Sequence, residues 1–156
     1  MLITIEPLAR HPQHVAEVAT WFRRQWPGWY GPGGKGCAKA DVQAFAASET
    51  ELPVGLVVLQ AGLPVGVGAL KADSIPTHRH LGPWAAAGFV VPGLRGQGIG
   101  ATVLEALVRH AYRLGYSSVY CGTSTAITLL RRSGWSELER IEHEGETLAI
   151  FKRTAG

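Results

Sequence analysis

The stretch VVPGLRGQGIGATVLEALVRHAYRLGY, residues 90–116, places four glycines and one arginine between an apolar run and a helical pattern. From residue 103 to residue 114, apolar side chains recur at helical spacing, which predicts a helix over 98–114 with one buried stripe. Glu105 and Arg109 lie on its other face at a spacing that favours an ion pair. Gly115 follows, where a left-handed residue commonly ends a helix.

An apolar run, a glycine loop and a helix start, in that order, are typical of an anion-binding site. The first turn of a helix leaves N–H groups unpaired and carries partial positive charge, so a phosphate binds there if the backbone is bare. Gly96, Gly98 and Gly100 have no side chain that would keep a phosphate from the backbone, and Arg95 adds a fixed positive charge. No Asp or Glu occurs between residues 74 and 104 to repel a phosphate. The alternative is a glycine-rich turn that only lets helix and strand pack closely.

Two nucleotide-binding motifs fit this loop poorly. GQGIGA satisfies the loose dinucleotide fingerprint, but it lies far from the first strand–helix unit, and the following VYCGTST carries no acid for a ribose. A P-loop needs Gly-Lys followed by Ser or Thr, whereas Ile99 follows Gly98.

The rest of the chain predicts an α/β (α+β) fold in a single domain over residues 1–156. We expect helices over 14–26, 38–47, 98–114 and 125–133. We expect strands over 2–6, 84–91 and 117–122, a hairpin over 54–71 that turns at Ala61-Gly62, and a closing hairpin over 137–153. The order is β-α-α-β-β-β-α-β-α-β-β. It predicts a central mixed sheet of six to seven strands flanked by about four helices, with 84–91 and 117–122 paired in parallel.

Composition narrows the class of protein. The chain is 46% hydrophobic and 17% charged, as soluble globular proteins are. Its net charge of +3 comes from scattered basic residues, so we expect no nucleic-acid partner. The longest uncharged run, 80–94, is too short and too rich in Gly and Pro for a membrane span. The start MLITIEPLAR lacks the basic and apolar regions typical of a signal peptide, so we expect none. Cys37 and Cys121 have no metal-site spacing, so we expect free thiols, no metal and a cytoplasmic location.

Several motifs together resemble the GCN5-related N-acetyltransferase (GNAT) family. Arg95, Gly98 and Gly100 match the family motif R/Q-x-x-G-x-G/A in register. LLRRSGW, residues 129–135, is similar to the family's FYxRxGF helix, and the order of elements resembles the family's from Leu2 to Lys152. Within the front half, Trp21, Trp26 and Pro83-Trp84 resemble a bacterial subgroup.

The resemblance implies a GNAT-like domain that uses acetyl-CoA and passes its acetyl group to a primary amine of a small molecule or peptide. It implies that the pyrophosphate accepts hydrogen bonds from the backbone of Gly96, Gln97, Gly98, Ile99, Gly100 and Ala101. It also implies that the pantetheine lies along 84–91 and bonds to backbone near Phe89 and Val90, where that strand splays from 117–122. A strand N–H near Val90 then stabilises the charge on the thioester oxygen during direct attack.

The chain departs from the family at both usual proton-transfer positions. Leu130 stands where many members carry a tyrosine acid, and WAAAGFVV lacks the strand glutamate that many use as a base. Tyr120, Ser124 and Thr128 are the replacement proton donors to consider, and Asp73, His78 and His80 are the replacement acceptors. We expect Tyr120 as the acid and Asp73, at the end of its strand, as the base. Catalysis by positioning alone is the alternative.

Two segments are candidates for the acceptor side. WPGWYGPGGKG, residues 26–36, is either a mobile wall or lid or a plain connection. Five glutamates between 137 and 146 offer carboxylates to a cationic amine, or they line a solvated hairpin face: Glu137, Glu139, Glu142, Glu144 and Glu146. The protein is expected to be a monomer or homodimer.

Three functions remain open at this point. The first is an acetyl-CoA-dependent N-acetyltransferase. The second is a catalytically silent acyl-CoA-binding module, favoured by Leu130 and by the acid-free strand. The third is a nucleotide-binding regulatory domain, weakened by the missing ribose acid.

Overall fold

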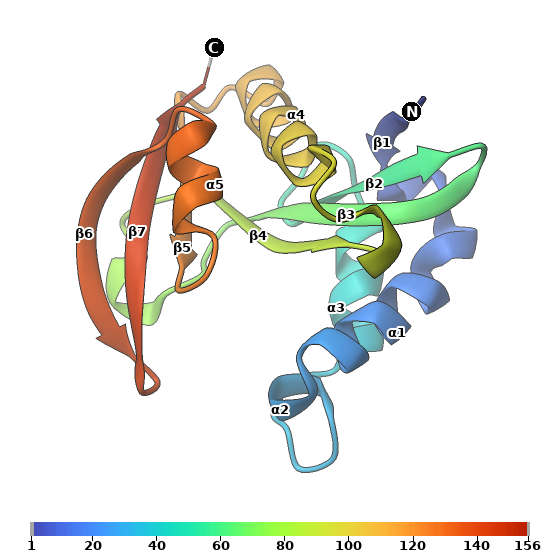
Figure 1. The fold of residues 1–156 in the computed structure, drawn as a ribbon, viewed down its shortest axis with the longest axis horizontal. Coiled ribbons are helices and arrows are strands. Elements are labelled where there is room, and N and C mark those ends of the chain that lie inside the picture. Colours follow the sequence, from blue (N-terminus) through green and yellow to red (C-terminus); the bar gives the residue numbers. More distant parts are fainter. Residues whose placement is uncertain (1, 156) are drawn as a thin grey trace.

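A computed structural model describes residues 2–155, which form a seven-stranded open sheet with helices on both faces (Figure 1). The strands are β1 (Thr4–Pro7), β2 (Val54–Gln60), β3 (Leu63–Lys71), β4 (Trp84–Val90), β5 (Ser118–Thr123), β6 (Ser136–His143) and β7 (Glu146–Thr154). The α-helices are α1 (Val15–Gln25), α2 (Pro27–Tyr30), α3 (Ala38–Phe45), α4 (Ile99–Arg113) and α5 (Ile127–Arg132). Short 3-10 turns are Leu8–Arg10, Pro12–His14, Pro76–His78 and Pro92–Leu94.

The strand order is β1-β2-β3-β4-β5-β7-β6, and all neighbours are antiparallel except the parallel pair β4 and β5. The predicted fold class and mixed sheet are therefore confirmed. The element order differs in one respect, because residues 26–36 contain the short helix α2. Pro27 starts this helix, a position where its fixed φ and missing N–H cost nothing.

Local backbone chemistry explains where two elements turn or end. Ala61 and Gly62 both have positive φ, 53° and 79°, which matches the two-residue turn that twisted antiparallel strands prefer. Gly115 has φ 97° and follows the last turn of α4, as the sequence predicts.

Two apolar cores lie on opposite faces of the sheet. On one face, α4 and α5 pack with the sheet through a cluster that includes Val103, Leu107 and Leu130. On the other face, α1 and α3 supply Phe22 and Phe45 to a second cluster. Figure 1 shows this arrangement, with α4 on one side of β2–β4 and with α1 and α3 on the other. Within residues 2–155, no helix combines the length and apolar character that a bilayer crossing requires.

Glu105 makes a different ion pair from the predicted one. It accepts two hydrogen bonds from Arg153 of β7, at 2.8 and 3.2 Å, and Arg153 also donates to the Ser133 carbonyl at 2.9 Å. This two-pronged geometry is stronger than a flexible pair along one helix. It ties α4 to β7 and leaves Arg109 without the partner that its sequence spacing suggests.

The strands β4 and β5 are joined only at one end. Their single registered pair is Trp84 with Tyr120, where the Tyr120 N–H donates to the Pro83 carbonyl at 2.9 Å. Further along, β4 is irregular: its register with β3 shifts, and Ala87 adopts a positive φ of 55°. A bulge bends a strand and increases its twist. The sheet therefore opens between β4 and β5 toward their carboxyl ends.

Candidate functional site

The gap between β4 and β5 contains a groove of about 730 Å³. Part of its lining, including Ala85 and Leu130, belongs to the core under α4. Another part, including Trp26, Val67 and Phe89, belongs to the core under α1. Because those two cores lie on opposite faces, the groove connects one face of the sheet with the other.

The glycine loop forms the α4 end of this groove. Gly96 and Gly98 have φ of 78° and 87°, and Gly98 is the residue that precedes α4. No side chain caps α4, so the N–H groups of its first turn have no capping partner there. A Cβ built on either glycine meets no protein atom within 4 Å. The loop therefore presents backbone N–H donors that no side chain covers, and we call it the backbone cradle.

The neighbours of these glycines contribute unequally. Ile99, Gly100 and Ala101 all line the groove, and the Ile99 side chain is also largely buried in the core. Gln97 is exposed and is not among the residues that line the groove.

Arg95 is folded back onto β4. Its Nε donates to the Val90 carbonyl at 2.8 Å and its Nη2 donates to Gln25 Oε1 at 3.3 Å. Its guanidinium carbon lies 5.2 Å from the centre of the Phe89 ring, a cation–π distance. Arg95 thus links the end of α1 to the end of β4 and also lines the groove, and its contact with a phosphate stays a prediction.

The backbone of β4 presents Val90 rather than Phe89 to the gap. The Val91 N–H donates to Val65 of β3 at 3.0 Å, and successive residues of a strand point their N–H groups in opposite directions. The Val90 N–H therefore faces away from β3. By the same alternation the Phe89 N–H is directed to β3, and the Phe89 ring supplies a wall of the groove.

The two residues expected to transfer protons lie outside the groove lining. Tyr120 packs against Trp84, with ring centres 5.8 Å apart, in the cluster of Ile75 and Ile150. Side chains alternate along β5, and its neighbour Cys121 lines the groove instead. Asp73 is exposed beyond the end of β3, and the next residue, Ser74, lines the groove.

Of the other four proton-transfer candidates, only Ser124 lines the groove. His78 is hydrogen-bonded through Nε2 to Glu139 and through Nδ1 to Thr77, and it stacks on His80. None of these side chains lines the groove, and neither does Thr128. Ser124 does, and its hydroxyl donates to Glu146 Oε2 at 3.3 Å.

Of the five hairpin glutamates, Glu146 is the one that is hydrogen-bonded to a residue lining the groove, although it does not line the groove itself. Glu137 is hydrogen-bonded to Arg140 and Arg131, which lower the pKa of its carboxyl, and Glu142 accepts a hydrogen bond from Thr147. By contrast, Glu146 contacts the groove-lining Ser124. Leu148, two residues on along β7, lines the groove from the same face, but only the structure shows which face of β7 that is.

The groove's inner wall is apolar around one thiol. Leu130, at the position of the family's tyrosine, is buried and lines the wall with Leu129. Burial raises the pKa of the Cys121 thiol to about 12, so this thiol stays protonated near neutral pH.

The bulge of β4 at Ala87 and Gly88 was not predicted from the sequence. A glycine inside a strand is a known signal of a bulge, so Gly88 could have indicated it.

Trp26 is the residue of the 26–36 segment that lines the groove. The Tyr30 hydroxyl donates to Asp41 at 2.6 Å, and the Tyr30 ring stacks on Phe22. Burial raises the pKa of the Tyr30 phenol above its ordinary value, and the hydrogen bond to Asp41 raises it further. The phenol therefore stays protonated and remains a donor. These contacts anchor α2 to α1 and α3.

Comparison with solved structures identifies the fold. An acetyltransferase of the GNAT family from Streptococcus pneumoniae has a TM-score of 0.73 at 16% identity, covering 99% of this chain and 100% of that one. An aminoglycoside 6'-N-acetyltransferase solved with coenzyme A has 0.77 at 14%, covering 99% and 97%. A ribosomal-protein-alanine N-acetyltransferase from Brucella melitensis has 0.71 at 17%, covering 99% of each chain.

No curated protein sequence matches the chain. The family model described as "Acetyltransferase (GNAT) family" matches residues 15–135, which include the glycine loop, β4, α4, β5 and α5. The resemblance read from Arg95, Gly98 and Gly100 is thereby confirmed, and the chain belongs to the GNAT family of acetyltransferases.

Proposed function

We propose that this protein is an N-acetyltransferase that moves an acetyl group from acetyl-CoA to a primary amine of a small molecule or peptide. The observation that carries the proposal is the groove through the sheet, which has a backbone cradle at its α4 end and an aromatic wall at its α1 end. Donor and acceptor then approach from opposite faces and meet in the gap between β4 and β5.

The residues at the cradle fit the pyrophosphate of coenzyme A. Gly96 and Gly98 leave room for a phosphate against the backbone, and the first turn of α4 offers N–H groups up to Ala101. The apolar lining between Ala85 and Leu130 suits the pantetheine arm, and the Val90 N–H faces the gap as its backbone partner.

Acetyl-CoA supplies a thioester whose carbonyl carbon is attacked by an amine and whose thiolate is a good leaving group. The backbone N–H of Val90 would donate a hydrogen bond to the carbonyl oxygen and so stabilise the negative charge that develops on it. Since a thiol has an unperturbed pKa of roughly 8.5, the leaving group needs little acid assistance, which accords with an apolar Leu130.

Cys121 does not fit the role of an intermediate acetyl carrier. A thiol attacks as its thiolate, and the raised pKa of Cys121, about 12, keeps it protonated. We therefore propose direct attack by the amine. Cys121→Ala is expected to retain kcat/KM within about threefold, whereas an enzyme that passes through a cysteine thioester loses orders of magnitude.

Alkylation provides an independent check of Cys121. With iodoacetamide at pH 8, the exposed Cys37 should react and Cys121 should not. Peptide mass spectra would report both sites. Acetylation of Cys121 after mixing with acetyl-CoA would contradict direct attack.

For the proton of the incoming ammonium, we propose Ser124 and Glu146. Glu146 is exposed and hydrogen-bonded to a hydroxyl that lines the groove, so a proton can pass from the groove to the carboxylate. Asp73 remains the second candidate, since it directly precedes the groove residue Ser74. Tyr120 is not carried forward, because its ring belongs to the Trp84 cluster.

The function is tested by measuring coenzyme A release in the presence of primary amines and their matched alcohols. Thiol release with amines alone, accompanied by acetylated amine, supports N-acetyl transfer. Binding of acetyl-CoA without release across the panel would instead indicate the silent acyl-CoA-binding module. A larger thermal shift with NAD than with acetyl-CoA would favour the nucleotide-binding domain.

A further inference from the structure

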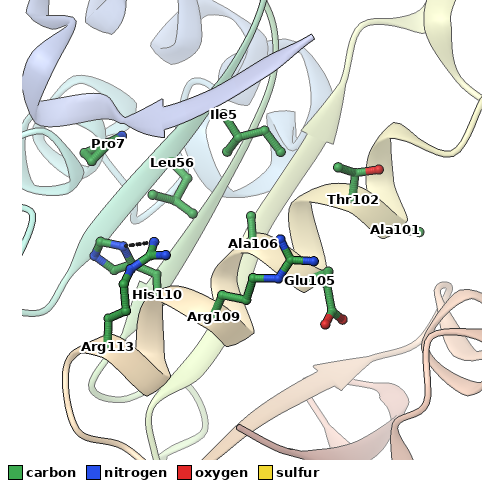
Figure 2. A pocket seen from close by; sticks show the side chains of 10 residues that line it. All are labelled: Ile5, Pro7, Leu56, Ala101, Thr102, Glu105, Ala106, Arg109, His110 and Arg113. Carbon is green, nitrogen blue, oxygen red and sulfur yellow. Dashed lines mark hydrogen bonds between the residues drawn. The ribbon is translucent and has the colours of Figure 1, made fainter. Parts of the chain in front are cut away.

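A second cavity, of about 550 Å³, lies between α4 and the edge strand β1 (Figure 2). Ile5, Leu56 and Ala106 give it apolar surface, and Arg109, His110 and Arg113 give it a basic side. Ala101 of α4 lines both this cavity and the groove between β4 and β5, so the helix lies between the two. Its volume lies within the range of small-molecule sites, roughly 300–1,000 Å³.

The carboxylates near this cavity are already matched with cations. Glu105 is held by Arg153 at 2.8 Å, and Glu49 is held by Arg10 at 2.7 Å. Arg109 and Arg113 make no ion pair with any carboxylate of residues 2–155 within 4.0 Å. Four residues apart on one helix, these two like charges repel each other. An anion between them would relieve that repulsion.

His110 holds one of the two arginines in place. It is 7% exposed, its Nε2 donates to the Glu49 carbonyl at 2.7 Å, and its Nδ1 accepts from Arg113 Nη2 at 3.4 Å. Both ring nitrogens therefore have a hydrogen-bond partner, one as donor and one as acceptor. Figure 2 shows the Arg113 guanidinium beside this ring. Arg113 is therefore oriented toward the cavity side of α4, with further N–H groups left to donate.

We propose that this cavity, which we call the α4–β1 pocket, binds a small anion that carries an apolar portion, with a carboxylate or phosphate head between Arg109 and Arg113. Guanidinium groups match both heads with paired donors. Ile5 and Leu56 cover the apolar portion. Its volume of about 550 Å³ matches a small molecule rather than an extended acidic chain. The proposal is independent of the acetyl-transfer chemistry.

Amide NMR titration tests the pocket with four probes of the same chain length: hexanoate, hexyl phosphate, hexanol and hexylammonium. At least one of the two anions should give saturable shifts at Ile5, Leu56 and residues 102–113, and the tighter one identifies the preferred head. Hexanol and hexylammonium should give none at the same concentrations. Equal shifts with hexanol, no saturable shift with either anion, or shifts confined to the glycine loop would each overturn the proposal.

A pair of double variants adds a charge-matched control. Arg109→Gln/Arg113→Gln should weaken anion binding at least tenfold. Arg24→Gln/Arg79→Gln removes the same charge from exposed positions outside the pocket and should leave binding unchanged. Equal weakening in both would show a general charge effect and contradict the site. If the first variant does not fold, the comparison of hexanoate with hexanol on the unaltered protein still decides.

Discussion

Gly98→Ala is expected to weaken acetyl-CoA binding by about 10- to 100-fold. A hydrogen bond to a charged group contributes about 1.5–3 kcal/mol, and a methyl group at Gly98 would occupy space that no protein atom fills. The φ of 87° adds a cost in stability, since a left-handed alanine is unfavourable by about 1–2 kcal/mol. Calorimetric titration would measure the affinity, and thermal unfolding would measure the stability.

Gly115→Ala is the matched control for this variant. Gly115 also has a left-handed φ, 97°, and open space where a methyl group would lie, but it is at the opposite end of α4. Both variants should lose similar stability, and only Gly98→Ala should lose affinity. Full acetyl-CoA affinity in folded Gly98→Ala would show that the cofactor does not approach this loop.

The second large effect is expected for Glu146→Gln. Loss of a positioned general base lowers kcat/KM by about 100-fold or more. At neutral pH a lysine-like amine, with a pKa of roughly 10.4, is mostly protonated, so the variant must use the small neutral fraction. Its rate should rise with pH until it approaches that of the unaltered enzyme, while acetyl-CoA affinity stays unchanged.

Three further variants make this result specific. Ser124→Ala removes the hydroxyl that links Glu146 to the groove and should reproduce most of the loss. Glu142→Gln, in the same hairpin but bonded to Thr147, should have no effect. Asp73→Asn should lie within about threefold of the unaltered enzyme. A 100-fold loss in Asp73→Asn with normal Glu146→Gln would return the role of base to Asp73.

Features set by neighbouring residues were predictable from the sequence. The apolar stripe of α4, the turn at Ala61-Gly62 and the end of α4 at Gly115 depend on periodicity and on backbone freedom within a few residues. The glycine loop was recognisable for the same reason, because its chemistry lies in consecutive backbone groups.

Features set by distant contacts were not predictable. Arg153 is 48 residues from Glu105, so no helical spacing reveals that it displaces Arg109 as partner. The contact of Ser124 with Glu146 depends on how β7 lies beside β5, and the orientation of Tyr120 depends on the face that β5 turns to Trp84. Proton-transfer residues are brought together by the sheet, and so the sequence could name candidates without choosing between them.

A crystal structure with bound coenzyme A would test the groove most directly. The expected result places the pyrophosphate against the N–H groups of Gly96 to Ala101, the pantetheine beside the Val90 N–H, and the thiol in the gap between β4 and β5 on the side of Trp26. Coenzyme A bound elsewhere, or with its thiol closed off from the α1 face of the sheet, would contradict the account.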